Sequence, residues 1–218
     1  MVFGLFKKRQ KRTEKPDQAA AAVQPAQDSL TPDTPIPFGY KTGWLCIRSD
    51  DPERVMEVLD VQDKRICNWS VGLEKAGENE TVFVSPVLNG FILVIGVLEP
   101  RPEQLKQWAA GFSELQYFGT HRVVDYHSWA RYQDGVLVRG YTFLGEAGEV
   151  TWEEGMPSPE ELALGAERFP KAGEEIEWES SEFPDEETVL SLAAAWGIDT
   201  RFDKTAYPAG LGWLCRLS

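Results

Sequence analysis

Two hydrophobic patterns recur along residues 42–217 and predict two kinds of element. Apolar runs, and runs in which every second residue is apolar, are typical of buried and half-buried strands. Apolar residues spaced by three and four positions after a capping residue are typical of helices that bury one face. The predicted strands are 42–48, 67–71, 81–85, 91–97, 150–153 and 211–217, with the two arms of a hairpin inside 121–144.

The clearest hairpin signal lies within 121–144. Its turn is Asp134-Gly135, a pair that readily takes the positive φ angles of a type I′ turn. Because a two-residue turn fixes how the two arms align, the sequence predicts the register of the whole hairpin. The predicted cross-strand pairs are Tyr132–Leu137, Trp129–Gly140, His127–Thr142 and Asp125–Leu144.

Start and stop signals mark the helical segments. Asp51 is a good N-cap in front of Pro52, and a segment at 102–110 is followed by Gly111. Ser158 and Glu161 have the spacing of a capping box, and 185–196 is closed by Gly197. Together with the strands, these segments predict an α+β fold, a mostly antiparallel sheet with three to four helices.

The first 37 residues differ from the rest in composition, and we expect them to form a disordered N-terminal tail. Residues 1–15 open with apolar side chains and continue with six bases and one acid, which makes them a basic amphipathic segment. Residues 16–37 are mostly Ala, Pro, Gln, Asp and Thr, too polar to build a core, and are expected to be a linker. A single acidic α+β domain is therefore predicted for 38–218.

The charge of the chain is segregated between these parts. The domain, 38–218, has 16 bases and 31 acids, a net charge of −15, whereas 1–15 has a net charge of +5. Nucleic-acid binding by the domain is disfavoured, because such a surface repels phosphate. The tail has the chemistry for weak contact with an anionic membrane, since apolar side chains insert and basic ones attract the lipid headgroups. The tail residues expected to make this contact are Phe3, Phe6, Lys7, Lys8 and Arg9.

The cysteines and the N-terminus bear on the compartment. Cys46, Cys67 and Cys215 are odd in number and lack C-x-x-C spacing, which argues against a disulfide framework and a structural zinc site. Apolar residues precede the basic ones at the N-terminus, the reverse of a secretory signal. We expect a cytoplasmic protein that is peripheral at the inner face of the membrane if its tail binds lipid. No metal and no cofactor is expected.

The two histidines of the chain are candidates for chemistry. On one strand, His121, Asp125 and His127 would share a face, and Asp125 and His127 would lie about 7 Å apart. That separation suits two ligands of one metal ion or an acid/base pair, although His121 would be about 13 Å from Asp125 unless the chain bends. The alternative is a solvated sheet face, or an Asp–His pair that holds a loop.

An acidic segment near 174–187 is the strongest charge feature. Carboxylates at a helix start are favoured by the helix dipole, which accounts for the acids at 185–187. Further upstream the acids alternate with Ile176 and Trp178, a pattern that suits either a solvated loop or a docking strip for a basic partner. The residues expected to bind that partner are Glu174, Glu175, Glu177, Trp178 and Glu179.

One part of the sequence resembles a known group of proteins. The segment 117–127 (YFGTHRVVDYH), followed by 138–146 (VRGYTFLGE), resembles an uncharacterised bacterial protein family over most of residues 38–200. That family has no known activity or site. The resemblance therefore implies a bacterial origin and nothing about mechanism.

Two classes of function follow. The first is a non-enzymatic, acidic protein-interaction module that masks a basic partner, for example an immunity-type protein of a toxin system. The alternative is a metal-assisted or acid/base hydrolase that uses His121, Asp125 and His127. The sequence contains neither a G-x-S-x-G nor an H-E-x-x-H motif, which favours the module. Convergence of the three residues in a concave pocket would favour the enzyme.

Overall fold

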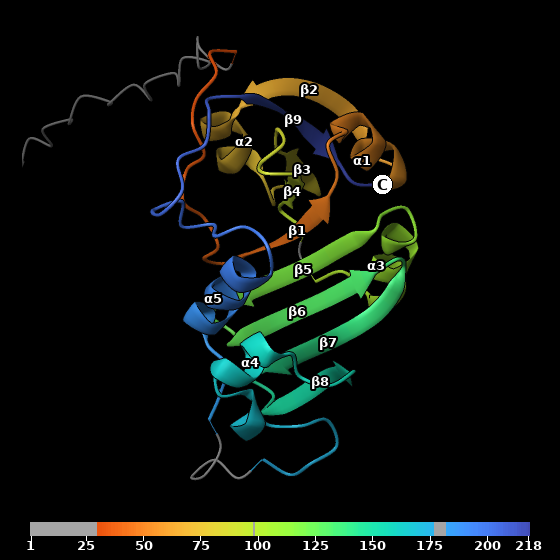
Figure 1. Ribbon diagram of the computed structural model, residues 1–218, viewed down its shortest axis with the longest axis vertical. Coiled ribbons are helices and arrows are strands. Elements are labelled where there is room, and N and C mark those ends of the chain that lie inside the picture. Colours follow the sequence, from red (N-terminus) through yellow and green to blue (C-terminus); the bar gives the residue numbers. More distant parts are fainter. Residues whose placement is uncertain (1–29, 98, 177–181) are drawn as a thin grey trace, which may run out of the picture.

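The computed structural model describes residues 30–97, 99–176 and 182–218. Nine strands within them form one antiparallel sheet, in the order β2-β9-β3-β4-β1-β5-β6-β7-β8 (Figure 1). The predicted mostly antiparallel sheet is therefore confirmed. The strands are β1 (Thr42–Arg48), β2 (Gln62–Asn68), β3 (Thr81–Val84), β4 (Phe91–Ile95), β5 (Glu114–His121), β6 (Tyr126–Gln133), β7 (Val136–Leu144), β8 (Glu149–Glu154) and β9 (Leu211–Arg216).

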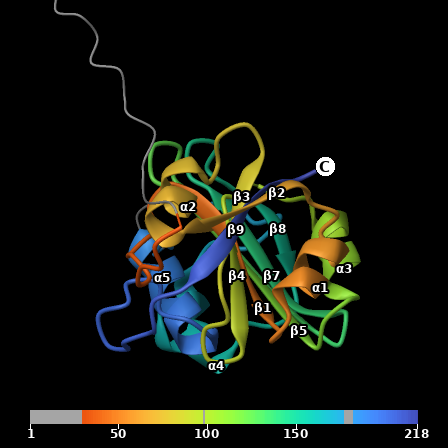
Figure 2. The ribbon, with the colours of Figure 1, turned by 90° about the horizontal axis from the view of Figure 1, so that it is seen from above.

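Five α-helices pack on this sheet in the described part of the chain, rather than the three to four predicted. Figure 2 shows α1 and α3 on one side of the strands and α2 and α5 on the other. None of the helices in the described residues is long and apolar enough to cross a membrane. The helices are α1 (Pro52–Val58), α2 (Trp69–Lys75), α3 (Pro102–Ala109), α4 (Pro159–Ala163) and α5 (Glu186–Trp196), with a 3₁₀ turn at Ala166–Arg168.

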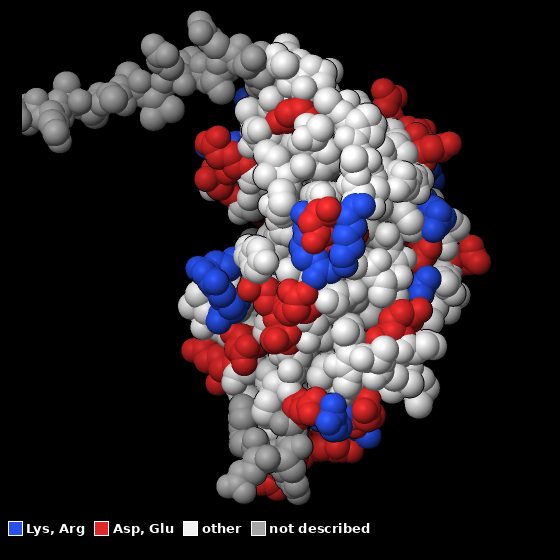
Figure 3. Space-filling view, turned by 60° about the vertical axis from the view of Figure 1, so that its left-hand side comes forward, with Lys and Arg blue, Asp and Glu red and all other residues white. Residues whose placement is uncertain are grey.

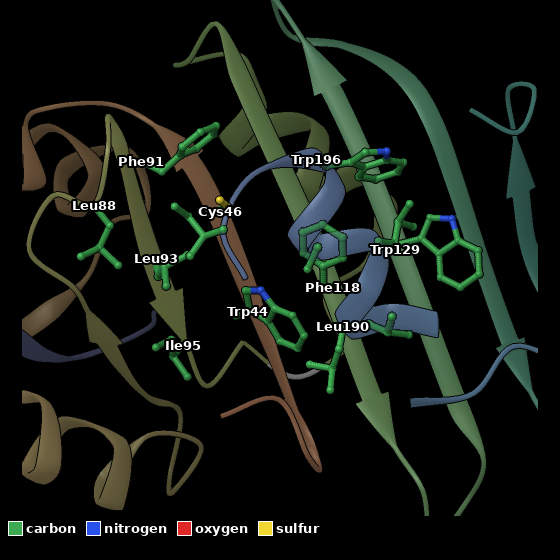
Figure 4. Packing of buried hydrophobic residues seen from close by; sticks show 14 of the residues in the cluster. Trp44, Cys46, Leu88, Phe91, Leu93, Ile95, Phe118, Trp129, Leu190 and Trp196 are labelled. Carbon is green, nitrogen blue, oxygen red and sulfur yellow. The ribbon is translucent and has the colours of Figure 1, made fainter. Parts of the chain in front are cut away.

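Each face of the sheet has its own hydrophobic core. On the face of α1 and α3, Val55 and Leu105 are buried against aliphatic strand residues. The face of α2 and α5 is richer in aromatic side chains, and Trp196 of α5 lies close to Phe118 of β5 (Figure 4). Trp44 stacks on Phe118 with ring centroids 5.4 Å apart. Because both faces of the central strands are buried, these strands form a rigid core that supports the surface sites described below.

Three helix starts form as their local sequence predicts. The Asp51 carboxylate accepts hydrogen bonds from two backbone N–H groups of α1. Ser158 and Glu161 form a reciprocal capping box at α4, and Asp185 forms one with Thr188 at α5. Each cap satisfies N–H groups that the helix itself leaves without acceptors.

The helix α2 corrects the prediction of a strand at 67–71. The strand β2 ends at Asn68, whose side chain accepts a hydrogen bond from Val71 N. Asp33 supplies a second cap, because its carboxylate accepts from Trp69 N at 2.6 Å and from Ser70 N at 3.0 Å. These caps stop the extended pattern and begin a helix, and Asp33 is too distant in sequence for local patterning to reveal it.

The last residues of the predicted linker contact the domain. The Gly210 N–H donates to the Asp33 carbonyl at 3.0 Å, and the Asn68 side chain donates to the Thr31 carbonyl at 3.1 Å. The folded contacts therefore begin before Phe38. Residues 1–29, which include the basic tail and most of the linker, lie outside the described residues.

The hairpin of β6 and β7 has the predicted turn but a different register beyond it. Tyr132 pairs with Leu137 as predicted, but the pairing then shifts, so that Arg131 faces Arg139 and Trp129 faces Tyr141. The predicted pairs Trp129–Gly140, His127–Thr142 and Asp125–Leu144 are wrong. A β-bulge that includes Val138 adds one residue to β7 and moves every later pair by one position. The observed pairs are Ala130–Gly140, His127–Phe143 and Tyr126–Leu144.

Candidate functional site

The two histidines lie on different strands. His121 ends β5, and the chain turns before His127 in β6, so the predicted single-strand face for His121, Asp125 and His127 is wrong. His121 pairs with Tyr126, whereas Thr120 pairs with His127. Because successive side chains alternate between the faces of a sheet, His121 and His127 are directed to opposite faces. The structure therefore separates His121 from the other two candidates.

Asp125 and His127 do come together, with Thr120 as a third member. His127 Nε2 lies 3.0 Å from Asp125 Oδ1, and His127 Nδ1 lies 3.2 Å from Thr120 Oγ1. Thr120 and His127 are each only 2% exposed, whereas the Asp125 side chain is 58% exposed. A hydrolytic triad needs an accessible hydroxyl and an oriented carboxylate, and here the hydroxyl is the buried member. The contacts of His127 with Asp125 and Thr120 are therefore suited to stabilising the turn between β5 and β6.

The position of Asp125 supports this structural role. Its backbone has φ of 51°, and its carbonyl accepts a hydrogen bond from Gly145 N at 2.9 Å. A side chain at Gly145 would collide with the Asp125 carboxyl group, so the two turns fit together only because Gly145 lacks one. No group of three His, Cys, Asp or Glu side chains in 30–97, 99–176 or 182–218 is placed to hold a metal ion.

Nucleophilic chemistry is also unsupported at Cys67. Cys67 is buried, and this burial raises its pKa to about 11. A thiol with that pKa is protonated near neutral pH, and the thiolate is the nucleophilic form. Cys67 therefore acts as a small core residue.

The other sequence candidates lie mainly outside the described residues. Glu174 and Glu175 are exposed, and Ile176 packs against the core on the α5 side of the sheet. Residues outside the description are Glu177, Trp178 and Glu179 of the acidic strip, and Phe3, Phe6, Lys7, Lys8 and Arg9 of the tail.

An ionic cluster around the buried Glu114, on the α5 side of the sheet, was not predicted. Its Arg48 side chain is half exposed. The Glu114 carboxylate accepts hydrogen bonds from Arg131 Nε and Gln116 Nε2, both at 2.9 Å, and from Arg48 Nε at 3.3 Å. Burial alone would raise the pKa of Glu114, but these hydrogen bonds and the charge of Arg131 together lower it below the ordinary value. Three partners converge on one carboxylate, so its acceptor capacity is used within the protein.

A second internal ion pair joins β7 to α4. Arg139 Nε donates to Glu161 Oε1 at 2.9 Å, and both residues are almost fully buried. Arg139 Nη1 donates to Glu153 and to the carbonyls of Glu154 and Gly155. The sequence pattern could not reveal this pair, because Arg139 lies on β7 and Glu161 on α4. The strand β8 separates these two elements along the chain.

A cleft opens between the segment 36–42 and the helix α2. Its volume is about 720 Å³, within the range of small-molecule and cofactor sites. Its apolar lining includes Phe38, Leu73 and Ile95, while Glu74 and Glu78 lie along the side formed by α2 and its C-terminal end. The full lining is Ile36, Pro37, Phe38, Gly39, Tyr40, Lys41, Thr42, Ser70, Leu73, Glu74, Ala76, Gly77, Glu78 and Ile95.

The wall formed by 36–42 is fixed in place. Phe38 N donates to the Thr200 carbonyl at 3.1 Å, and the Phe38 ring meets Trp44 edge-on at 5.5 Å between centroids. Gly39 has φ of 132°, and any side chain there would collide with Leu190 of α5. The cleft is therefore formed by a wall held against the core.

Apolar side chains of this wall remain exposed. Ile36 is 39% exposed and Tyr40 57% exposed, and both line a cleft whose lining also includes the buried Ile95. The face of the molecule in Figure 3 carries separate groups of acidic and basic side chains. Exposed apolar side chains beside a concave site are typical of an interaction surface.

A second cleft, of about 310 Å³, is lined by hydroxyl groups of β5, β6 and β7. Tyr117 and Tyr126 hydroxyls lie 3.2 Å apart, and Ser128 Oγ lies 2.7 Å from Thr142 Oγ1. Burial raises the pKa of both tyrosines, so they stay protonated near neutral pH. These hydroxyls bond to one another, which makes the second cleft a weaker candidate than the cleft beside α2.

Comparisons with known proteins give no relative from which a role could be transferred. No family model matches the sequence, and the searches of curated proteins and of solved structures found no match either. The functional argument therefore rests on the geometry and the charge of this chain.

Proposed function

We propose that this protein is a non-enzymatic interaction module that holds an apolar, basic segment of a partner in the cleft beside α2. The observation that carries the proposal is the cleft itself, in which Ile36 and Tyr40 stay exposed on a wall fixed by Phe38 and Gly39. A preformed apolar site avoids the entropy cost of ordering its own wall when it binds.

Charge supports a basic partner. The domain has a net charge of −15, and the charged side chains that line the cleft are Glu74, Glu78 and Lys41. Lys75 pairs with both carboxylates, at 3.1 Å and 3.8 Å, but all three side chains are well exposed, so these pairs are weak and exchangeable. A long-range negative field speeds the approach of a basic segment more than it tightens the final complex.

An immunity-type protein that masks a basic toxin is one form that such a module can take. The acidic strip that includes Glu174 and Glu175 is proposed as a second contact for the same partner. The hydrolase alternative has less geometric support, because His121 faces away from His127 and the Thr120 hydroxyl is buried.

The test uses a defined peptide with the chemistry of the proposed partner. A fluorescein-labelled peptide of alternating leucine and lysine is titrated with the full chain and with residues 30–218, and binding is followed by fluorescence anisotropy. Its counterpart with glutamate in place of lysine controls for charge. We expect the lysine peptide to bind residues 30–218 and the glutamate peptide to bind far more weakly.

A pair of matched variants locates the binding. Ile36→Ser with Tyr40→Ser removes apolar surface from the cleft, while Val136→Ser with Val138→Ser removes exposed apolar surface from β7. The first pair is expected to abolish binding and the second to leave it unchanged. Equal binding by both pairs would show that the peptide is held by general charge attraction, and no binding to any form would overturn the proposal.

A further inference from the structure

We propose that the chain's own N-terminal segment, residues 1–12, occupies the cleft beside α2 in the 218-residue chain and competes with the partner. This inference rests on the proposed function, because it names the first occupant of the same site. It makes the tail an intramolecular inhibitor that a partner segment must displace.

The path of the chain leads to the cleft. The first described residues lie beside α2 (Figure 1), where Asn68 holds the Thr31 carbonyl and Ser70 Oγ donates to Asp33 Oδ2 at 2.6 Å. Ser70 also lines the cleft, and so do Ile36 and Pro37 further along the same segment. The 29 residues that precede Leu30 are therefore tethered at the rim of the site.

The number of residues between Phe6 and Leu30 allows the N-terminal segment to reach the cleft, and it keeps the local concentration of that segment high. A flexible chain of the length between Phe6 and Leu30 has a root-mean-square span of roughly 25–29 Å. The helix α2, which forms one side of the cleft, is only about 10 Å long. Tethering at such a range gives an effective concentration on the order of millimolar, so even a weak contact would be populated.

The chemistry of the segment matches the cleft. Val2, Phe3, Leu5 and Phe6 offer apolar side chains to a lining that contains Phe38, Leu73 and Ile95. The bases that follow, from Lys7 to Arg12, are then within reach of the exposed carboxylates of Glu74 and Glu78. The segment 1–15 has a net charge of +5 against −15 for the domain, so attraction acts before any contact forms.

A spin label places the tail directly. The native cysteines of the domain are buried, so a nitroxide on Gly4→Cys reacts selectively near neutral pH. Amide NMR signals of residues 70–78 are then compared between the oxidised and the reduced label. We expect broadening at 70–78 that disappears at high salt or with Phe3→Ser and Phe6→Ser, and no broadening at β8. Uniform or absent broadening would overturn the inference.

Competition separates this inference from the proposed function. The leucine–lysine peptide is expected to bind residues 30–218 at least about tenfold more tightly than the full chain. Phe3→Ser with Phe6→Ser should restore tight binding to the full chain, whereas Val23→Ser, a control in the linker, should not. If the full chain and residues 30–218 bind the peptide equally, the tail does not occupy the cleft, while the proposed binding site stands.

Discussion

The indole Nε1 of Trp129 donates a hydrogen bond to Glu161 Oε1 at 2.8 Å, so a β6 side chain and the capping box of α4 share one carboxylate. The same oxygen accepts from Arg139, and Glu161 Oε2 accepts from Ser158 N. One buried side chain thereby links the sheet, the start of α4 and an internal arginine.

Removing that carboxylate should be costly. Glu161→Ala removes the closer of the two carboxylates that pair with the buried Arg139, leaving only Glu153, and it also removes the acceptor of the Trp129 indole. We therefore expect a loss of about 3–5 kcal/mol in the free energy of unfolding. Chemical denaturation with urea measures the change. Glu167→Ala, at an exposed position after α4, is the control and should change little. A loss below about 1 kcal/mol for Glu161→Ala would show that water enters and solvates Arg139.

Asp33 should contribute to stability although it precedes the predicted domain. Asp33→Ala removes the acceptor for two N–H groups at the start of α2, and caps of this kind are worth about 0.5–2 kcal/mol. Thermal unfolding of residues 30–218, with and without the substitution, measures this. A protein that begins at residue 38 should lose at least as much, and equal stability of the two lengths would contradict the contact.

The pH dependence of stability should report Glu114. Its pKa is lower in the folded protein than its ordinary value of 4.5, because hydrogen bonds and the charge of Arg131 outweigh the effect of burial. The stabilisation is therefore complete above about pH 4.5 and is lost as the pH falls through the lower, folded pKa. Glu114→Gln should flatten this part of the curve of unfolding free energy against pH. If the loss of stability at low pH is unchanged in Glu114→Gln, other carboxylates are responsible for it.

Gly140 tests the observed register. A side chain at position 140 would meet the Trp152 ring of β8, not Trp129, so Gly140→Val should cost about 1–3 kcal/mol by overpacking. In a double-mutant cycle, Trp152→Ala should remove most of that cost, because it empties the space that valine needs. If the two substitutions destabilise the protein additively, the steric clash of valine at position 140 is with a residue other than Trp152.

Local signals explain which elements the sequence could predict. The bounds of β1 and the starts of α1, α4 and α5 depend on neighbouring residues, such as Asp51 in front of Pro52 and the Ser158–Glu161 spacing. The strand β5 was missed because it buries the polar Glu114, Gln116 and Thr120 along with its apolar residues, so its sequence lacks the apolar run of a buried strand. The bulge at Val138 and the cap from Asp33 depend on contacts that no short window contains.

The candidate site was less accessible from sequence than the fold. His127 and Asp125 were expected to be near each other and are, but their chemistry is decided by the burial of Thr120, a cross-strand neighbour on β5. The cleft beside α2 joins residues 36–42 to residues 70–78, and it exists because α2 is a helix. Since 67–71 was predicted to be a strand, no pattern could have revealed it.

The position of β9 between β2 and β3 determines the order in which the strands can join the sheet during synthesis. Among the described strands, β2 pairs only with β9, which is synthesised after the other eight strands. Until then β2 has no neighbour in the sheet, and the edge of β3 that β9 will cover is open to other chains. Folding during synthesis can therefore complete the block from β3 to β8, but β2 and the packing of α2 against β9 must wait for the last strand. A nascent chain stalled before residue 211 should accordingly protect this block from proteolysis and leave β2 and α2 open to cleavage.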